Sequence, residues 1–355
     1  MYNRRKSRVV SVGGVKVGGD NPISIQSMAN TDTRDIAATV AQIRALEAEG
    51  CEIARVAVLD EAAARCLPDI KRQISIPIVA DIHFDYRLAI LSMEYGIDKL
   101  RINPGNIGGE ENVRAVAEMA KRKNIPIRVG VNGGSLSKAI LAKYGKVTAE
   151  GLAESALENI AMLEKYGFDN IILSIKASNI PLTVATHEII ADKIDYPLHI
   201  GITEAGPKTA GVIKSAAGAA ALLTRGIGDT LRVSLTDDPI SEIICAKRIL
   251  QALGLRNFDP EIISCPSCGR CKVDLIAMTH EVEKRLEGIS KYLKIAVMGC
   301  EVNGPGEARE ADIGIACGKA SGLIFKGGEI VRRIPAGLLV DALMEELRNM
   351  GVVNV

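Results

Sequence analysis

The sequence has no Trp, and aromatic residues make up only 3% of its 355 residues. Proteins that bind single-stranded nucleic acids commonly stack bases on aromatic side chains, so the composition argues against that class. Neither sign of charge is in excess, because 44 Lys and Arg residues stand against 43 Asp and Glu residues. The chain therefore lacks the general attraction for nucleic acid that a strong positive charge provides. We expect no nucleic-acid partner, and any anion must bind at a local site.

Long apolar runs are also absent. None approaches the roughly 18 residues that a membrane span requires, and the opening segment has no apolar stretch of the signal-peptide type. We therefore expect no membrane partner and a cytoplasmic location. The chain instead has 47% hydrophobic and 25% charged residues, which are typical proportions for a globular protein with an aliphatic core.

Short apolar runs that favour strands alternate with helix-like segments along most of the chain. Near-continuous apolar strands separated by helices are typical of a parallel sheet covered by helices. Eight such units favour an α/β fold, a (β/α)8 TIM-type barrel, over an open doubly wound sheet. The eight runs are residues 23–28, 53–58, 76–83, 99–104, 125–132, 170–177, 198–205 and 229–235.

Polar residues follow the apolar runs, at the strand ends where a barrel of this type carries its active site. Five of them are cations from five different strands. Close cations repel one another by about 1 kcal/mol or more per pair at an effective dielectric constant near 20, so a polyanion is needed among them. A ligand with two phosphates would use this many donors. The cations are Arg55, Arg101, Arg128, Lys176 and Arg232.

Acid and base candidates at the same strand ends are Asp81, His83 and Glu204. Each has two possible roles, either transferring a proton or orienting a neighbouring arginine through an ion pair. The stretch NPGNIGG at residues 103–109 lies between a strand and a helix. It either offers backbone N–H groups to a phosphate or forms a plain tight turn.

Eight cysteines remain to be explained, at positions 51, 66, 245, 265, 268, 271, 300 and 317. The first three lie in helical or strand-entry segments and are interpreted as small buried hydrophobic residues. Cys317 follows an alternating strand and is interpreted in the same way. The others gather after position 264, and structural disulfides are not expected in the reducing cytosol, so their clustering indicates metal or redox chemistry.

The strand and helix pattern breaks after Leu255. We therefore expect two domains, a substrate-binding barrel over residues 1–260 and a small α+β domain over residues 261–355. Cys265, Cys268 and Cys271 follow C-x2-C-x2-C spacing, which suits either zinc or an iron–sulfur cluster. A thioredoxin-type dithiol is disfavoured because the motif does not open the helix of a βαβ unit. A cationic barrel beside the cysteines favours a cluster that delivers electrons to an anionic substrate.

Nine ordered motifs resemble those of the bacterial 4-hydroxy-3-methylbut-2-enyl diphosphate synthase family of the non-mevalonate isoprenoid pathway. They span essentially the whole chain. The motifs are QSMANTDT, VADIHFDYRLA, KLRINPGNIG, RVGVNGGSL, SIKASN, HIGITEAG, GIGDTLRVSL, CPSCGR and GCEVNGPGEA.

The resemblance implies a reaction and its cofactor. The reaction is the reductive ring opening of 2-C-methyl-D-erythritol 2,4-cyclodiphosphate, with loss of a hydroxyl as water. Two electrons pass through a [4Fe-4S] cluster, and the electron donor is flavodoxin or ferredoxin. The implied cluster ligands are Cys265, Cys268, Cys300 and Glu307, so Cys271 departs from the family pattern. The family also implies a head-to-tail homodimer, in which the cluster domain of one subunit caps the barrel of the other.

The same resemblance assigns roles at the barrel mouth. The five cations would bind the diphosphate, with Asn132 and Ser234 as hydrogen-bond partners. Glu204 would lie near the reacting carbons as the catalytic residue, either delivering a proton or holding the hydroxyl that leaves. Asp81 and His83 are further candidates for substrate binding.

The residues alone leave two other classes of protein possible. One is a phosphate-binding lyase or aldolase with a zinc-stabilised tail, in which Lys176 forms a Schiff base. The other is a non-enzymatic metal-binding scaffold, which the converging charges at the strand ends disfavour.

Overall fold

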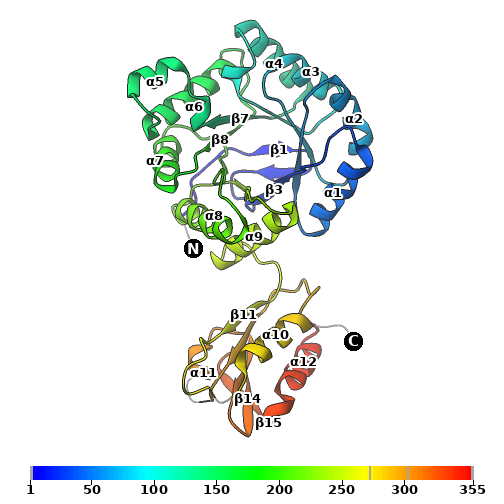
Figure 1. Cartoon of the computed structure of the whole chain (residues 1–355), viewed down its shortest axis with the longest axis vertical. Coiled ribbons are helices and arrows are strands. Elements are labelled where there is room, and N and C mark those ends of the chain that lie inside the picture. The colour runs from blue at the N-terminus through cyan, green and yellow to red at the C-terminus, as the bar shows by residue number, and fades with distance from the viewer. Residues whose placement is uncertain (1–2, 272, 302–303, 353–355) are drawn as a thin grey trace. The chain divides into compact units, whose positions relative to one another are not determined.

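The computed structural model describes residues 3–271, 273–301 and 304–352. They form two compact units that divide between Arg256 and Asn257 (Figure 1). The boundary expected from the sequence, between residues 260 and 261, falls four residues later. In the described part of the chain, no helix is both long and apolar enough to cross a bilayer.

The first unit is a barrel of eight parallel strands. A bridge between Leu173 and Leu198 joins the two outermost strands, β8 and β9, and so closes the sheet. Each of the eight runs expected from the sequence contains one of these strands, so the predicted (β/α)8 fold is confirmed. The strands are β3 (Ser24–Met28), β4 (Ile53–Ala57), β5 (Ile78–Asp81), β6 (Lys99–Ile102), β7 (Ile127–Asn132), β8 (Ile171–Lys176), β9 (His199–Ile200) and β10 (Thr230–Leu231).

Helices surround the strands as a ring (Figure 1). Polar caps start several of them: Asp60 accepts a hydrogen bond from the N–H of Ala63, and Thr148 from that of Gly151. The helices are α1 (Ile36–Ala48), α2 (Glu61–Lys71), α3 (Tyr86–Glu94), α4 (Glu110–Lys123), α5 (Lys138–Tyr144), α6 (Ala149–Glu164), α7 (Ile180–Ala191), α8 (Lys208–Leu223) and α9 (Pro239–Ala252).

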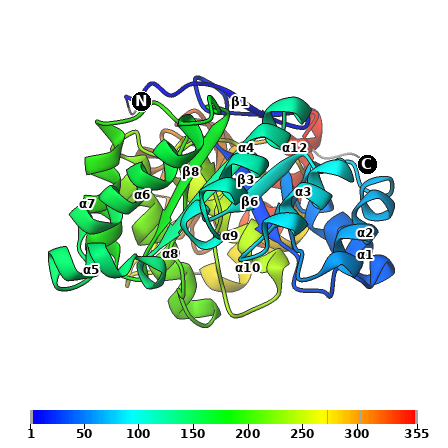
Figure 2. The same ribbon diagram turned by 90° about the horizontal axis from the view of Figure 1, so that it is seen from above.

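A hairpin of β1 (Val10–Val12) and β2 (Val15–Val17) covers one end of the barrel (Figure 2). Its valines pack on Ile53, Val79 and Ile172, which lie near the amino ends of their strands. The sequence analysis did not identify this hairpin, because strands of three residues are too short to show a period. The hairpin covers the amino end, which leaves the carboxyl ends of the strands as the open mouth.

The second unit is an α+β domain with its own five-stranded sheet. Its first three strands are parallel, and the last two continue the sheet as antiparallel neighbours. The strands are β11 (Glu261–Ser264), β12 (Lys294–Met298), β13 (Ile313–Cys317), β14 (Ser321–Lys326) and β15 (Glu329–Pro335), and the helices are α10 (Leu275–Arg285), α11 (Gly304–Glu307) and α12 (Leu339–Asn349).

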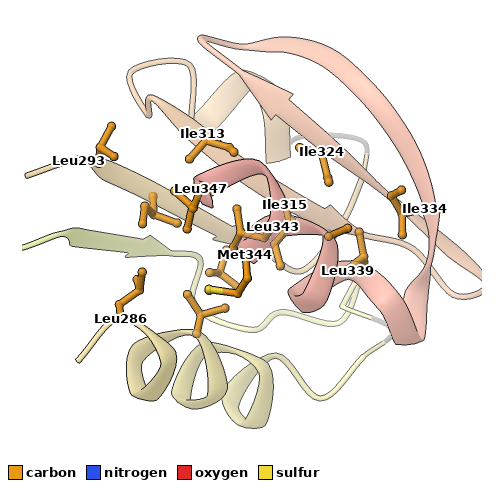
Figure 3. Close-up of a cluster of buried hydrophobic side chains, with 14 of the residues drawn as sticks. Leu286, Leu293, Ile313, Ile315, Ile324, Ile334, Leu339, Leu343, Met344 and Leu347 are labelled. Carbon is orange, nitrogen blue, oxygen red and sulfur yellow. The ribbon is translucent and has the colours of Figure 1, made fainter. Parts of the chain in front are cut away.

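The core of the second unit lies between the sheet and two helices, α10 and α12 (Figure 3). Leu343 and Leu347 of α12 pack with Ile313 and Ile315 of β13. Cys317 belongs to this core, and burial raises the pKa of its thiol to about 12. Its thiol is therefore unreactive, in agreement with the structural role expected for it.

Candidate active site

A cavity of about 530 Å³ opens at the carboxyl ends of the barrel strands, a size suited to a small-molecule ligand. Five residues expected at the site line it: His83, Arg101, Asn132, Lys176 and Glu204. The lining does not include the other barrel candidates, which are Arg55, Asp81, Arg128, Arg232 and Ser234. Lining residues that the sequence analysis did not single out include Val147, Ser178, Asn179, Leu182 and Thr203.

Asp81 is the centre of an ion-pair network below the cavity. One carboxylate oxygen lies 3.0 Å from Nη1 of Arg101, and the other lies 3.8 Å from Nε of Arg55 and 3.6 Å from Nε2 of His83. Burial raises the pKa of Asp81, but the contact with His83 and the charges of Arg55, Arg101 and Arg128 outweigh it. The pKa therefore lies below its ordinary value, and Asp81 acts as a fixed anion that orients two arginines.

Arg128 and Lys176 are also buried, whereas Arg232 is partly exposed. Arg128 is 1% exposed, and its Nε and Nη2 have no hydrogen-bond partner in the structure. Burial, followed by the charges of Arg55 and Arg101, lowers the pKa of Arg128 well below its ordinary value. Burial also lowers the pKa of Arg55 to about 10, although Asp81 opposes the shift. These cations destabilise one another, so the cluster is built to accept negative charge.

Glu242 of α9 is a second buried carboxylate, and the sequence analysis missed it. Its carboxylate accepts hydrogen bonds from Ser27 Oγ and from the N–H of Leu235, both at 3.0 Å. It also lies 3.5 Å from Nε of Arg232. In the sequence, Glu242 looks like any acidic residue on the exposed face of an amphipathic helix. Only the fold brings it into contact with Ser27, which lies far away in the sequence.

Glu204 lies exposed on the loop after β9 and lines the cavity. Its backbone is in the left-handed region, with φ of 52°, which few residues other than glycine adopt. Such strain is found where a side chain has to be presented in a particular direction. The backbone carbonyl of Glu204 accepts a hydrogen bond from Lys214 of α8 at 3.3 Å, which helps to hold the loop.

The loop after β6 carries the glycine stretch considered for phosphate binding. Its residues Pro104–Asn106 form a 3-10 turn that Asn103 caps. The N–H of Gly105 donates to the side chains of Asn103 and Asn159, at 3.1 and 2.7 Å. This N–H is therefore not available to a ligand, and at Gly105 the interpretation as a plain turn holds.

The cysteines of the second unit follow neighbouring strand ends. Cys265 comes directly after β11 and Cys300 two residues after β12, and these strands are parallel with Ser264 opposite Val297. The N–H of Gly299 donates to Cys265 Sγ at 3.2 Å. Parallel pairing thus brings the loops that carry the expected ligands to one edge of the sheet.

The donor set of these loops suits a thiophilic metal group. Hydrogen bonds from the backbone and side chain of Arg270 lower the pKa of the exposed Cys268, which favours the thiolate that binds metal. The N–H bond to Cys265 is of the kind that supports cluster sulfurs. No group of three or more His, Cys, Asp or Glu side chains is gathered for a metal within the described residues. Glu307 ends α11, and its side chain lies outside the described part of the structure.

Cys271 has a different environment. Its thiol donates to the carbonyl of Val273 at 3.3 Å and packs against Gly299, where an added Cβ would lie 2.8 Å from the sulfur. Cys271 therefore lies beside the loop of Cys300, although the family pattern gives it no ligand role.

Two family models match consecutive parts of the chain. The GcpE TIM-barrel domain matches residues 7–247, and the GcpE protein C-terminal domain matches residues 261–349. Two solved barrels share the fold of the first unit, and each covers 70% of this chain and is itself covered to 98%. They are a dihydropteroate synthase from Stenotrophomonas maltophilia (TM-score 0.51, 15% identity) and a type I 3-dehydroquinate dehydratase from Clostridium difficile (TM-score 0.52, 13% identity). At these identities the likeness shows the fold alone.

Curated relatives match at much higher identity. Proteins of Caldanaerobacter subterraneus subsp. tengcongensis and Geobacter sulfurreducens are each 56% identical to this chain, over 98% of both sequences. Both are named 4-hydroxy-3-methylbut-2-en-1-yl diphosphate synthase (flavodoxin). The resemblance inferred from the nine motifs is therefore confirmed, and the chain belongs to the GcpE family.

Proposed function

We propose that this chain is an iron–sulfur oxidoreductase that converts 2-C-methyl-D-erythritol 2,4-cyclodiphosphate to 4-hydroxy-3-methylbut-2-enyl diphosphate. Two electrons open the cyclic diphosphate, and one hydroxyl leaves as water, in a step of isoprenoid precursor biosynthesis. The observation that supports this proposal most strongly is the excess of buried cations at the barrel mouth. Arg55, Arg101, Arg128 and Lys176 are each at least nine-tenths buried, and Asp81 pairs with only Arg55 and Arg101.

The diphosphate binds through the mouth cations. Arg101 and Lys176 reach the cavity directly, whereas Arg55, Arg128 and Arg232 contribute charge from below or beside it. Asn132 and Ser234 add hydrogen bonds to the phosphates, and His83 and Asp81 hold Arg101 in place. Buried charges at the base of the pocket make such contacts stronger than they would be in bulk water.

Glu204 is the acid proposed for the chemical step. It lines the same cavity as Arg101 and Lys176, and its backbone has a positive φ. Its proposed role is to deliver the proton that converts the leaving hydroxyl into water.

Cys265, Cys268, Cys300 and Glu307 are the proposed ligands of a [4Fe-4S] cluster. When bound, such a cluster would supply the electrons for the reduction, and Glu307 would be a weaker ligand to it than the three thiolates. The thiolates must stay reduced, which favours the cytoplasm as the compartment. The names of the two relatives include flavodoxin. We propose flavodoxin as the electron donor of this chain, with ferredoxin as the alternative.

The protein purified without oxygen tests this function. We expect a brown protein with about four irons and four sulfides per chain, an EPR signal on reduction, and turnover of the cyclic diphosphate with reduced flavodoxin. A colourless protein that holds one zinc per chain and does not turn the substrate over would overturn the proposal.

We also propose that a head-to-tail homodimer brings the barrel of one subunit to the cluster domain of the other. Mixing subunits that carry Arg55→Ala with subunits that carry Cys300→Ser tests this arrangement. Recovered activity in the mixture supports sites shared between subunits. If the mixture stays inactive after the subunits have exchanged, each active site is formed within one chain.

A further inference from the structure

Lys99, the first residue of β6, lies inside the barrel beneath the cations of the mouth. Its side chain is fully buried, and it does not line the cavity. Its Nζ donates a hydrogen bond to Gln26 Oε1 of β3 at 2.9 Å, across the interior. Among the described residues, no carboxylate lies within ion-pair distance of Lys99. The barrel thus encloses an amine that has no counterion and no role in the function proposed above.

The groups around Lys99 make this burial unfavourable for a charged amine. Arg128 of β7 and Arg55 of β4 are close enough for their charges to act on it. His199 of β9 is also fully buried, and neither of its ring nitrogens has a hydrogen-bond partner. The Nε2 of Gln26 has none either. The layer is therefore polar and carries no negative charge.

A buried ammonium without a counterion is costly, and the side chain reduces that cost by releasing its proton. Burial, followed by the charges of Arg128 and Arg55, lowers the pKa of Lys99 well below its ordinary value. Burial and the charges of Arg128, Lys176 and Lys99 lower the pKa of His199 in the same way, so that ring does not supply a charge.

We propose that Lys99 is a further member of the anion site and takes up a proton when a polyanion binds in the mouth above it. The inference rests on the proposed function, because it requires a polyanionic ligand among the mouth cations. A bound polyanion offsets the charges of Arg55 and Arg128 and attracts the ammonium form of Lys99. By linkage, the proton that Lys99 gains strengthens binding of the anion.

Calorimetric titration of the full-length protein with inorganic pyrophosphate tests the inference. The titration is run at about pH 8 in two buffers with different ionisation heats, which yields the number of protons taken up. The wild-type protein is compared with Lys99→Met and Lys99→Arg. The first variant removes the titrating amine, and the second replaces it with a permanent cation. Protonation of the ligand and of other groups is common to the three proteins and cancels in the comparison.

We expect the wild-type protein to take up more protons on binding than either variant. Lys99→Met binds pyrophosphate about tenfold more weakly, because a nearby positive charge is lost, whereas Lys99→Arg retains affinity within about threefold. Lys16→Met is the matched control. Lys16 is exposed on the hairpin at the other end of the barrel, so this variant behaves as wild type.

Equal proton uptake in wild type and variants would overturn the role of Lys99 while leaving the proposed function intact. Failure of the wild-type protein to bind pyrophosphate would count against the mouth as a diphosphate site, and so against both. If Lys99→Met does not fold, as judged by circular dichroism, the comparison with Lys99→Arg decides the matter, because that variant also cannot take up the proton.

Discussion

The guanidinium of Arg101 lies against the bare backbone of Gly130 on the neighbouring strand. A Cβ atom at position 130 would lie 2.7 Å from Nε and 3.0 Å from Nη2 of Arg101, closer than side chains normally approach. Asp81 holds the same guanidinium from its other neighbouring strand, at 3.0 Å. Arg101 therefore has its place in the cavity because one flanking strand offers a carboxylate and the other offers no side chain.

Gly130→Ala is expected to displace Arg101 without unfolding the barrel, since the backbone of Gly130 is not among those with positive φ. Loss of one charged contact to a phosphate should weaken pyrophosphate binding about tenfold and raise the KM for the cyclic diphosphate similarly. Calorimetry and steady-state kinetics measure the two effects. Gly14→Ala is the control, because a Cβ there meets nothing within 4 Å. Wild-type affinity in Gly130→Ala would contradict the positioning role.

Asp81→Asn is expected to destabilise the empty protein by about 3 kcal/mol, because Arg55 and Arg101 lose their buried counterion. Urea unfolding measures the free energy of unfolding. The exposed Asp169, which pairs with Arg8, gives the control Asp169→Asn, with a change below about 0.5 kcal/mol. If both variants unfolded at the same urea concentration, the Asp81 network would not be a structural ion pair.

The stabilisation by Asp81 also has a defined dependence on pH. Because the folded pKa of Asp81 lies below its ordinary value of 3.8, the contribution is complete above that value and is lost as pH falls through the folded pKa. The difference in unfolding free energy between wild type and Asp81→Asn should therefore be constant near neutral pH and shrink only in strong acid. A difference that already declines between about pH 7 and 5 would point to another group.

Cluster content distinguishes the proposed ligands from the other cysteines. Cys265→Ser, Cys268→Ser and Cys300→Ser should each lose most of their iron and sulfide, whereas Cys271→Ser and Cys317→Ser should retain them. Iron and sulfide analysis with EPR, all without oxygen, gives the answer. Full loss of iron and sulfide in Cys271→Ser, together with their retention in Cys300→Ser, would show that Cys271 and not Cys300 is the cluster ligand.

The hydrogen bond from Gly299 to Cys265 predicts an effect on the reduction potential. N–H bonds to sulfur stabilise the more negative, reduced state of a cluster and so raise its potential. In Gly299→Ala the new Cβ would meet the sulfur of Cys271, and the shifted backbone should weaken the bond and lower the potential.

The double variant Gly299→Ala with Cys271→Ala opens the space again and should regain most of the wild-type potential. Cys271→Ala alone is the control, and EPR-monitored redox titration is the measurement. A double variant as low in potential as Gly299→Ala alone would show that contact with Cys271 is not the cause.

The sequence by itself was enough for the barrel and its eight strands. This was possible because strand and helix patterns are local, and because carboxyl ends of parallel strands share one edge. The sequence also predicted five cations at strand ends, but in the structure Arg55 lies in the middle of β4 and Arg128 near the start of β7. The two-residue strands β9 and β10 were found through the apolar runs around them. The C-x2-C spacing likewise indicated a metal site, but left zinc and iron–sulfur open until the family resemblance was considered.

Only the tertiary structure decided how the charges are balanced and which of them reach the cavity. Glu242 joins Ser27 and Arg232 across the fold, and nothing in its own helix distinguishes it from a surface acid. Lys99 begins a strand like many exposed lysines, and the closure of the barrel places its side chain in the interior. Burial and counterion pairing depend on contacts between residues far apart in sequence, so local patterns do not contain them.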